Sequence, residues 1–83
     1  MSIGVELLKK LDQQFTPSTL VEIRHKGMDL SIKTDGNGNA ILAFIGRRDN
    51  NGTVKGERYV RTLLFNPHGV KVKDHWELKG RST

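Results

Sequence analysis

The chain has 83 residues and a mass of 9.3 kDa, which suffices for one domain with a thin core, so we expect residues 1–83 to form a single domain. It has no cysteine, which excludes disulfides and thiolate metal sites. The net charge is +5, and no apolar run approaches the roughly 18 residues that span a membrane. Because the N-terminus also lacks the pattern of a signal peptide, we expect a cytoplasmic protein without membrane contact.

The first segment has the apolar period of an amphipathic helix. Its apolar positions recur at spacings of three and four, with one adjacent pair, and are Ile3, Leu7, Leu8, Leu11 and Phe15. Ser2 is the expected N-cap, and Pro17 prevents the helix from continuing. A helix of about 13 residues is marginal alone in water, so its apolar stripe must pack on another element.

After Pro17 the apolar period changes to two, which indicates half-buried strands. Residues 40–45 are apolar at every position and predict a central strand with both faces covered or nearly so. Turn signals separate the segments at intervals of about 8 to 13 residues, the spacing of an antiparallel meander. We therefore predict an α+β fold in which an N-terminal amphipathic helix packs on a five-stranded antiparallel β-meander. A strongly curved or barrel-like sheet is the alternative.

Four predicted turns set the strand registers, since register follows loop length. They are two-residue turns at Lys26–Gly27, Asn51–Gly52 and Pro67–His68, and a turn centred on Asn37. The turns predict the cross-strand pairs Val21–Ile32, Ile32–Leu42, Phe44–Tyr59 and Tyr59–Trp76, and they place Arg61 opposite Asp74. They agree on one apolar face, which we expect the helix to cover: Val21, Ile23, Met28, Leu30, Ile32, Ala40, Leu42, Phe44, Tyr59, Leu63, Phe65, Val70, Val72, Trp76 and Leu78.

The opposite face of the predicted sheet mixes apolar and basic side chains. Its apolar centre consists of Ile41, Ala43, Ile45, Val60 and Leu64, and its basic residues are Lys33, Arg47, Arg58, Lys71 and Lys73. An exposed apolar patch of this kind is typical of a binding site or a subunit interface. If the sheet instead closes toward a barrel, the same apolar residues would line its interior.

The sequence offers little for catalysis or metal binding. Asp35, Asn37 and Asn39 alternate as in the first half of a calcium-binding loop, but Ala40 and Gly46 stand where that loop needs Gly and Glu, so a hairpin turn is expected. The predicted registers do not bring the three histidines together, and no serine nucleophile or carboxylate pair has a recognisable context. We therefore expect neither enzymatic activity nor a cofactor.

The remaining hypotheses concern binding. The mixed face predicts a small non-enzymatic module that binds a protein partner or a second copy of itself, most simply as a homodimer. The alternative is a single-stranded nucleic-acid-binding domain that uses the basic residues of the same face. Sheets that bind single strands need exposed aromatic side chains, and the predicted register places the large aromatics on the helix-covered face, which favours the protein-binding hypothesis.

Overall fold

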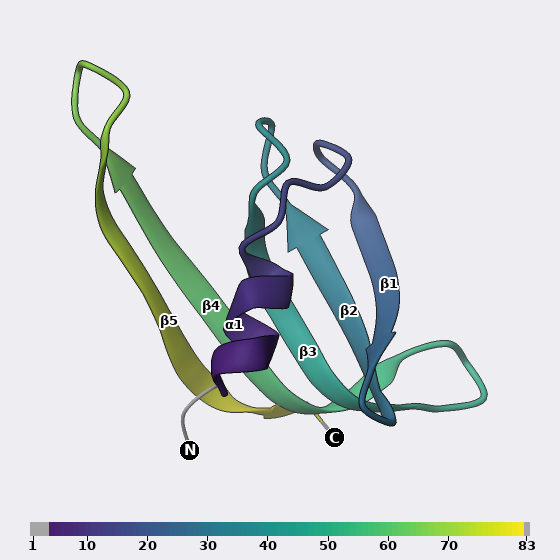
Figure 1. The fold of residues 1–83 in the computed structure, drawn as a ribbon. Helices are drawn as coiled ribbons and strands as arrows, with labels where there is room; N and C mark the ends of the chain where they lie inside the picture. The colour runs from purple at the N-terminus through teal and green to yellow at the C-terminus, as the bar shows by residue number, and fades with distance from the viewer. Residues whose placement is uncertain (1–3, 83) are drawn as a thin grey trace.

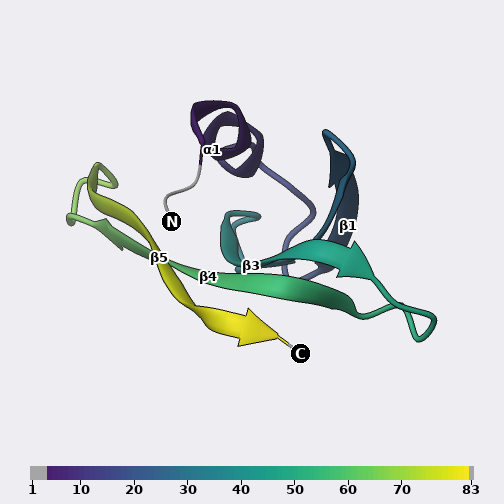
Figure 2. The ribbon, with the colours of Figure 1, turned by 90° about the horizontal axis from the view of Figure 1, so that it is seen from below.

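The computed structural model describes residues 4–82 and shows one short helix on an open, five-stranded antiparallel sheet (Figures 1 and 2). The elements are α1 (Val5–Leu11), β1 (Leu20–His25), β2 (Met28–Thr34), β3 (Ala40–Arg48), β4 (Val54–Phe65) and β5 (Lys71–Ser82). The strands lie in sequence order, so β1 and β5 are the two edges. The predicted helix-on-meander architecture is confirmed in outline, although the protein is mostly β. The barrel alternative is wrong because the edges do not pair.

Helix α1 is shorter than predicted. It ends at Leu11, whereas the apolar stripe extends to Phe15. The backbone N–H of Phe15 donates to the carbonyl oxygen of Gly38 at 2.8 Å, which draws this part of the chain onto the end of the sheet in a non-helical conformation. The predicted cap Ser2 and the first stripe residue, Ile3, lie outside the described residues.

Three of the four hairpin loops share one structure. In each, an Asp or Asn side chain accepts the backbone N–H groups two and four residues later, and a Gly in the fourth position has φ near +80°; the loops are 35–39, 49–53 and 66–70. The backbone pattern is that of a three-residue hairpin connection, a type I turn followed by a left-handed residue. Only the Lys26–Gly27 turn, with φ of 49° and 79°, is the two-residue turn that was predicted.

The loop lengths, together with register shifts inside the β2–β3 and β4–β5 pairs, decide which predicted registers hold. The β1–β2 register is confirmed, with Val21 opposite Ile32. The β2–β3 register is wrong by one residue, since Ile32 lies opposite Ala43 and the register shifts by one residue between the hairpin loop and this pair. The β3–β4 register is also wrong by one, because Tyr59 lies opposite Ala43 and not Phe44. The two errors cancel at β4, so Tyr59 stays on the helix side as predicted. The side chains of β3, in contrast, lie on the faces opposite to those predicted.

The β4–β5 register differs from the prediction by two residues. Arg61 lies opposite Trp76, and Leu63 lies opposite Asp74. A shift of two leaves the side chains of residues 73–78 on their predicted faces, since side chains alternate with period two, whereas the register shift beside Phe65 moves Lys71 to the other face. Tyr59 therefore pairs with Leu78 instead of Trp76, but all remain on the side of α1.

The core lies between α1 and the centre of the sheet. Its buried members are Leu7, Leu11, Leu30, Ile32, Ala40, Ala43, Ile45 and Tyr59, and the half-buried Phe15, Val21, Ile23 and Trp76 pack against them. Burial raises the pKa of Tyr59, and the nearby Glu57 carboxylate adds to this effect. Leu42 and Phe44, predicted for the core, are absent from this cluster because the true register turns them to the opposite face.

A close approach of backbone occurs where β3 and β4 leave the core. Gly46 lies opposite Gly56, and a Cβ atom on Gly46 would stand 2.0 Å from the carbonyl oxygen of Lys55. Beyond this pair the β3–β4 hairpin reaches β1, where the Arg48 guanidinium donates to Glu22 at 2.6 Å. Val54, in the same hairpin, is only 2% exposed.

Candidate functional site

The open face, defined as the face of the sheet opposite α1, has a different apolar centre from the one predicted. By strand alternation it carries Leu20, Leu42, Phe44, Val60 and Leu64. Of the predicted set, only Val60 and Leu64 keep their places. Ala43 and Ile45 were assigned to this face wrongly: they lie in the core with exposed fractions of 0% and 6%. Ile41 is the extra residue where the β2–β3 register shifts and is half-buried.

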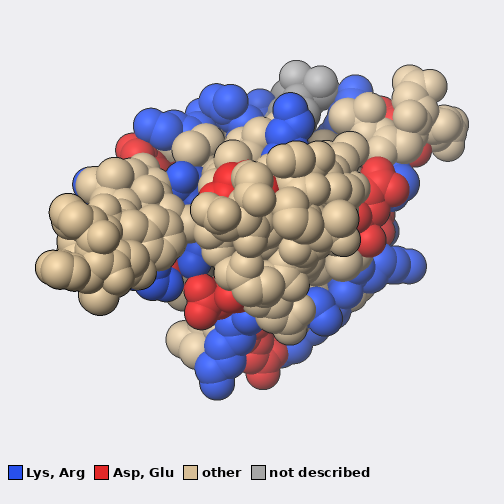
Figure 3. Space-filling model, turned by 90° about the horizontal axis from the view of Figure 1, so that it is seen from above, with Lys and Arg blue, Asp and Glu red and all other residues tan. Residues whose placement is uncertain are grey.

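The structure also separates the five basic residues. Lys33, Arg58 and Lys73 lie on the open face. Lys71 does not, because the register shift beside it turns its ammonium group toward α1, 2.8 Å from Asp74 Oδ2. Arg47 lies on the same face of β3 as Ala43 and Ile45, which is the helix side, and is opposite Lys55 in the β3–β4 hairpin. Figure 3 shows Lys and Arg side chains along the margin of the molecule away from the helix and also along the opposite margin.

A shallow pocket lies on the open face between β1 and the β3–β4 hairpin. It has a volume of about 270 Å³ and is lined by Leu20, Glu22, Ser31, Lys33, Phe44, Gly52, Thr53 and Val54. The β3–β4 hairpin therefore covers part of Phe44. The exposed apolar area at the centre of the open face is smaller than expected from the residues that alternate on β3. Among residues 4–82, every fully buried polar side-chain atom has a hydrogen-bond partner.

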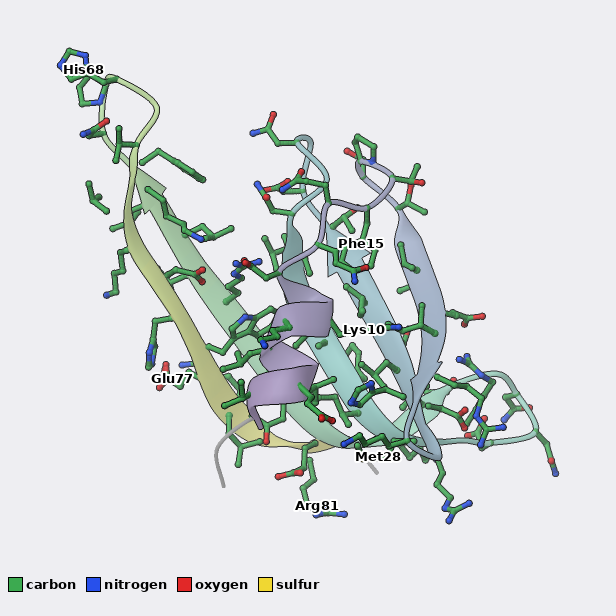
Figure 4. All side chains as sticks on the ribbon, viewed as in Figure 1. Lys10, Phe15, Met28, His68, Glu77 and Arg81 are labelled. Carbon is green, nitrogen blue, oxygen red and sulfur yellow. The ribbon has the colours of Figure 1, made fainter. Side chains whose placement is uncertain are left out.

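The β4–β5 arm, defined as residues 62–75, is the part of this hairpin that extends past β3 (Figure 1). Four large apolar side chains of the arm are at least half exposed: Leu64 at 51%, Phe65 at 50%, Val70 at 57% and Val72 at 62%. Residues 63–70 contain no charged residue, and the hairpin tip forms the uncharged lobe at the left of Figure 3. Figure 4 shows His68 at this tip, far from α1.

Arg61 fixes the base of the arm. Its side chain is 3% exposed, and its Nε and Nη2 donate to the two carboxylate oxygens of Asp74, both at 2.7 Å. Nη2 also donates to Asp12 at the end of α1, at 2.8 Å, and Nη1 donates to the Ala40 carbonyl at 3.2 Å. The guanidinium lies 5.5 Å from the centre of the Trp76 ring. One buried cation thus joins the helix, β3 and β5.

The charges in this cluster depend on one another. The hydrogen bonds from Arg61 hold the pKa of Asp74 well below its usual range, and Lys71 adds to the effect. In return, the Asp74 carboxylate raises the pKa of Arg61 further. The predicted Arg61–Asp74 ion pair is confirmed, whereas the contact with Asp12 was not foreseen. A groove of about 260 Å³ runs beside this cluster between α1 and β5, with Val5, Leu8 and Trp76 as apolar lining.

No group of three or more potential metal ligands occurs within the described part of the chain. Among the described residues, no helix has the length and apolarity needed to cross a membrane. Comparison with known proteins adds nothing, since no protein-family model, no curated protein and no solved structure matches the chain.

Sequence reasoning missed the β4–β5 arm as the most exposed apolar region. It assigned Phe65, Val70 and Val72 to the helix-covered core, but α1 has only seven residues and lies over the centre of the sheet, not over the arm (Figure 2). The signal that could have revealed the arm is the run 63–70, which contains no charged residue and includes a hairpin turn. A helix as short as α1 cannot cover both this hairpin and the centre of the sheet.

Proposed function

We propose that this protein is a non-enzymatic module that binds another protein chain, in the first place a second copy of itself, through the β4–β5 arm. One observation carries the proposal. The arm is only two strands wide, no other element within residues 4–82 covers it, and it exposes four large apolar side chains. An isolated two-stranded ribbon is marginally stable in water, and such a patch on a soluble protein is typical of an interaction site.

The size of the arm suits a modest interface. Its four exposed apolar side chains, together with Val5 and Leu8 in the adjacent groove, offer roughly 500 Å² of apolar surface per copy. A standard interface buries about 800 Å² per partner, of which a little more than half is apolar. Leu64 lies on the open face whereas Val5 and Leu8 lie in the groove beside α1, so a single interface with a second copy covers part of this apolar surface.

Sedimentation velocity at micromolar to tens of micromolar concentration tests the proposal. The wild type is expected to sediment as a dimer of the 9.3 kDa chain. Val72→Asp should yield a folded monomer, since the side chain is 62% exposed within one copy and its change costs the monomer little. Leu20→Asp is the matched control, because Leu20 is 53% exposed at the opposite edge of the sheet and should leave the dimer intact. A wild type that remains monomeric would refute the proposal.

A second candidate is single-stranded nucleic-acid binding on the open face, and one observation favours it. The true register brings Phe44 onto the open face, with Arg58 directly opposite it and Lys33 lining the same pocket. Stacking on an aromatic ring beside basic side chains is how sheets bind single strands. Titration with a labelled oligonucleotide at two salt concentrations tests this. Tight binding that weakens steeply with salt and is lost in Phe44→Leu supports it, whereas no binding at low salt refutes it.

A further inference from the structure

The outer edge of β5 is a strand edge of 12 residues to which no other strand of the described chain pairs. The other edge of the sheet, β1, has only 6 residues. A long edge presents backbone N–H and C=O groups that can pair with another strand. We propose that β5 pairs antiparallel with β5 of a second copy around a two-fold axis at His75. This inference rests on the proposed self-association and specifies its geometry.

Charge complementarity selects this register. In a two-fold strand pair, residue i lies opposite j and j lies opposite i. An axis at His75 places Lys73 of each copy opposite Glu77 of the other, so the interface gains two ion pairs. Both side chains lie on the open face, and directly opposed Cβ atoms are about 4.5–5.5 Å apart. Figure 4 shows Glu77 projecting outward beside β5.

Lys73 is available for such a pair. None of the ion pairs between described residues includes Lys73, whereas Lys71 and Lys79 each have a carboxylate partner within the chain. Glu77 has a side chain that is 55% exposed and lies 3.2 Å from the Lys79 ammonium group. A carboxylate has acceptor sites for a second cation, so the pair with Lys79 does not compete with Lys73.

The neighbouring registers place like charges together. An axis at Asp74 sets the two Asp74 side chains opposite each other, and an axis at Glu77 does the same for Glu77. An axis at Trp76 sets Lys73 opposite Lys79. Moving the two-fold axis by one residue shifts one β5 strand by two residues along the other, which keeps each side chain on its own face of the sheet. The axes at neighbouring residues are therefore the relevant alternatives.

An axis at Leu78 would bring Glu77 opposite Lys79, but it extends the pairing through the bent end of β5. Gly80 has φ of +124°, and the register with β4 shifts beside it, so the strand is irregular there. Figure 1 shows β5 running along the left edge of the sheet and turning at its lower end. The axis at His75 confines the pairing to the straight part of the strand.

The same register also covers apolar surface. It sets Val72 of one copy, 62% exposed, opposite Leu78 of the other, 37% exposed. The two β4–β5 ribbons then join into one four-stranded ribbon, which removes the instability of a ribbon two strands wide.

One kind of like-charge pair remains and occurs twice around the two-fold axis, but the chain already neutralises it. Lys71 and Lys79 would lie opposite each other. The Lys71 ammonium group is turned to the helix side, 2.8 Å from Asp74, and Lys79 is held beside Glu77 at 3.2 Å. Their charges are therefore directed apart and each faces a carboxylate.

Charge reversal tests the register, with dimer dissociation measured by sedimentation at low ionic strength. Lys73→Glu and Glu77→Lys should each weaken the dimer at least tenfold, because each sets like charges opposite each other twice. The double variant should return to within about threefold of wild type, since the pairs are restored with opposite polarity. In the double variant the Glu77→Lys change still leaves two ammonium groups, at positions 77 and 79, side by side within one chain. A recovery of dimer affinity must therefore come from contacts between the two copies. Lys33→Glu, which makes the same change in charge on β2, is the matched control and should leave the dimer unchanged.

The outcomes distinguish the two levels of the proposal. If the wild type is dimeric but the single reversals have no effect, or the double variant is weaker than either single one, the register is wrong while self-association stands. If the wild type is monomeric at tens of micromolar, both the register and the proposed function are wrong, and the lysines of β5 serve to keep the edge unpaired.

Discussion

The Arg61–Asp74 pair at the base of the arm should be strongly coupled. Asp74→Leu leaves the Arg61 guanidinium, 3% exposed, with Asp12 as its remaining carboxylate. Removing one partner of a buried ion pair costs about 3–5 kcal/mol, and the retained contact with Asp12 places the expected loss near the lower value. This is a large part of the roughly 4–12 kcal/mol expected for a chain of this length.

The reverse deletion should cost less. In Arg61→Met, the Asp74 side chain is 27% exposed and keeps the Lys71 ammonium group at 2.8 Å, so its charge stays partly solvated and paired. We expect a loss of about 1–3 kcal/mol, mainly from the missing hydrogen bonds. The double variant, Arg61→Met with Asp74→Leu, leaves no buried charge unpaired. Its loss should therefore fall short of the sum of the single losses by about 2 kcal/mol.

Urea unfolding followed by far-ultraviolet circular dichroism measures all four proteins. The measurements must share one protein concentration, because self-association would make the apparent stability depend on it. The control is a cycle on Arg24 and Asp29, an ion pair of 3.3 Å in which Arg24 is 71% exposed and the coupling should stay below about 1 kcal/mol. Additive losses for Arg61 and Asp74 would refute the account of a buried cation that depends on this carboxylate.

Two further predictions concern the backbone and the response to acid. Gly46→Ala should lower the free energy of unfolding by about 1–3 kcal/mol, because the new Cβ would meet the Lys55 carbonyl at 2.0 Å. Gly36→Ala, with no atom within 4 Å of its Cβ position, should stay within about 0.5 kcal/mol, and equal losses in urea would contradict the close approach. Arg61 lowers the pKa of Asp74, so this carboxylate stabilises the fold above its unfolded pKa of about 3.9, and the contribution is lost as the pH falls through the folded pKa. The difference in unfolding free energy between wild type and Asp74→Asn should be constant above about pH 5 and shrink below about pH 4. A difference that persists unchanged at low pH would contradict the assigned cause.

The order and direction of the elements were predictable from local pattern. The change from helical to alternating apolar period at Pro17, and the turn residues that follow it, give one helix and five antiparallel strands in sequence order. The Lys26–Gly27 turn fixed the β1–β2 register because a two-residue connection leaves one solution. Arg61 and Asp74 were placed on one face correctly because the register error in β4–β5 was an even number.

The β3–β4 register needed a signal that was present in the sequence but not used, whereas the β2–β3 turn was predicted with its true centre, Asn37, and that register failed at the shift beside Ile41. An Asp or Asn followed three residues later by Gly occurs at 35–38, 49–52 and 66–69, and all three form the same three-residue connection. Assuming a two-residue turn at Asn51–Gly52 instead moved the β3–β4 register by one. The positive φ of the fourth-position Gly is the physical requirement that links this spacing to the loop.

Tertiary structure alone decided which face of β3 is buried. Residues 40–45 are apolar at every position, so alternation gives no preference between Leu42 with Phe44 and Ala43 with Ile45. The shift at Ile41 settles the choice and turns Ala43 and Ile45 toward the core. The end of α1 was likewise set by a contact distant in sequence, the hydrogen bond from Phe15 to Gly38. Sequence period thus determines which side chains share a strand face, whereas the partner that covers each face depends on packing between elements far apart in the chain.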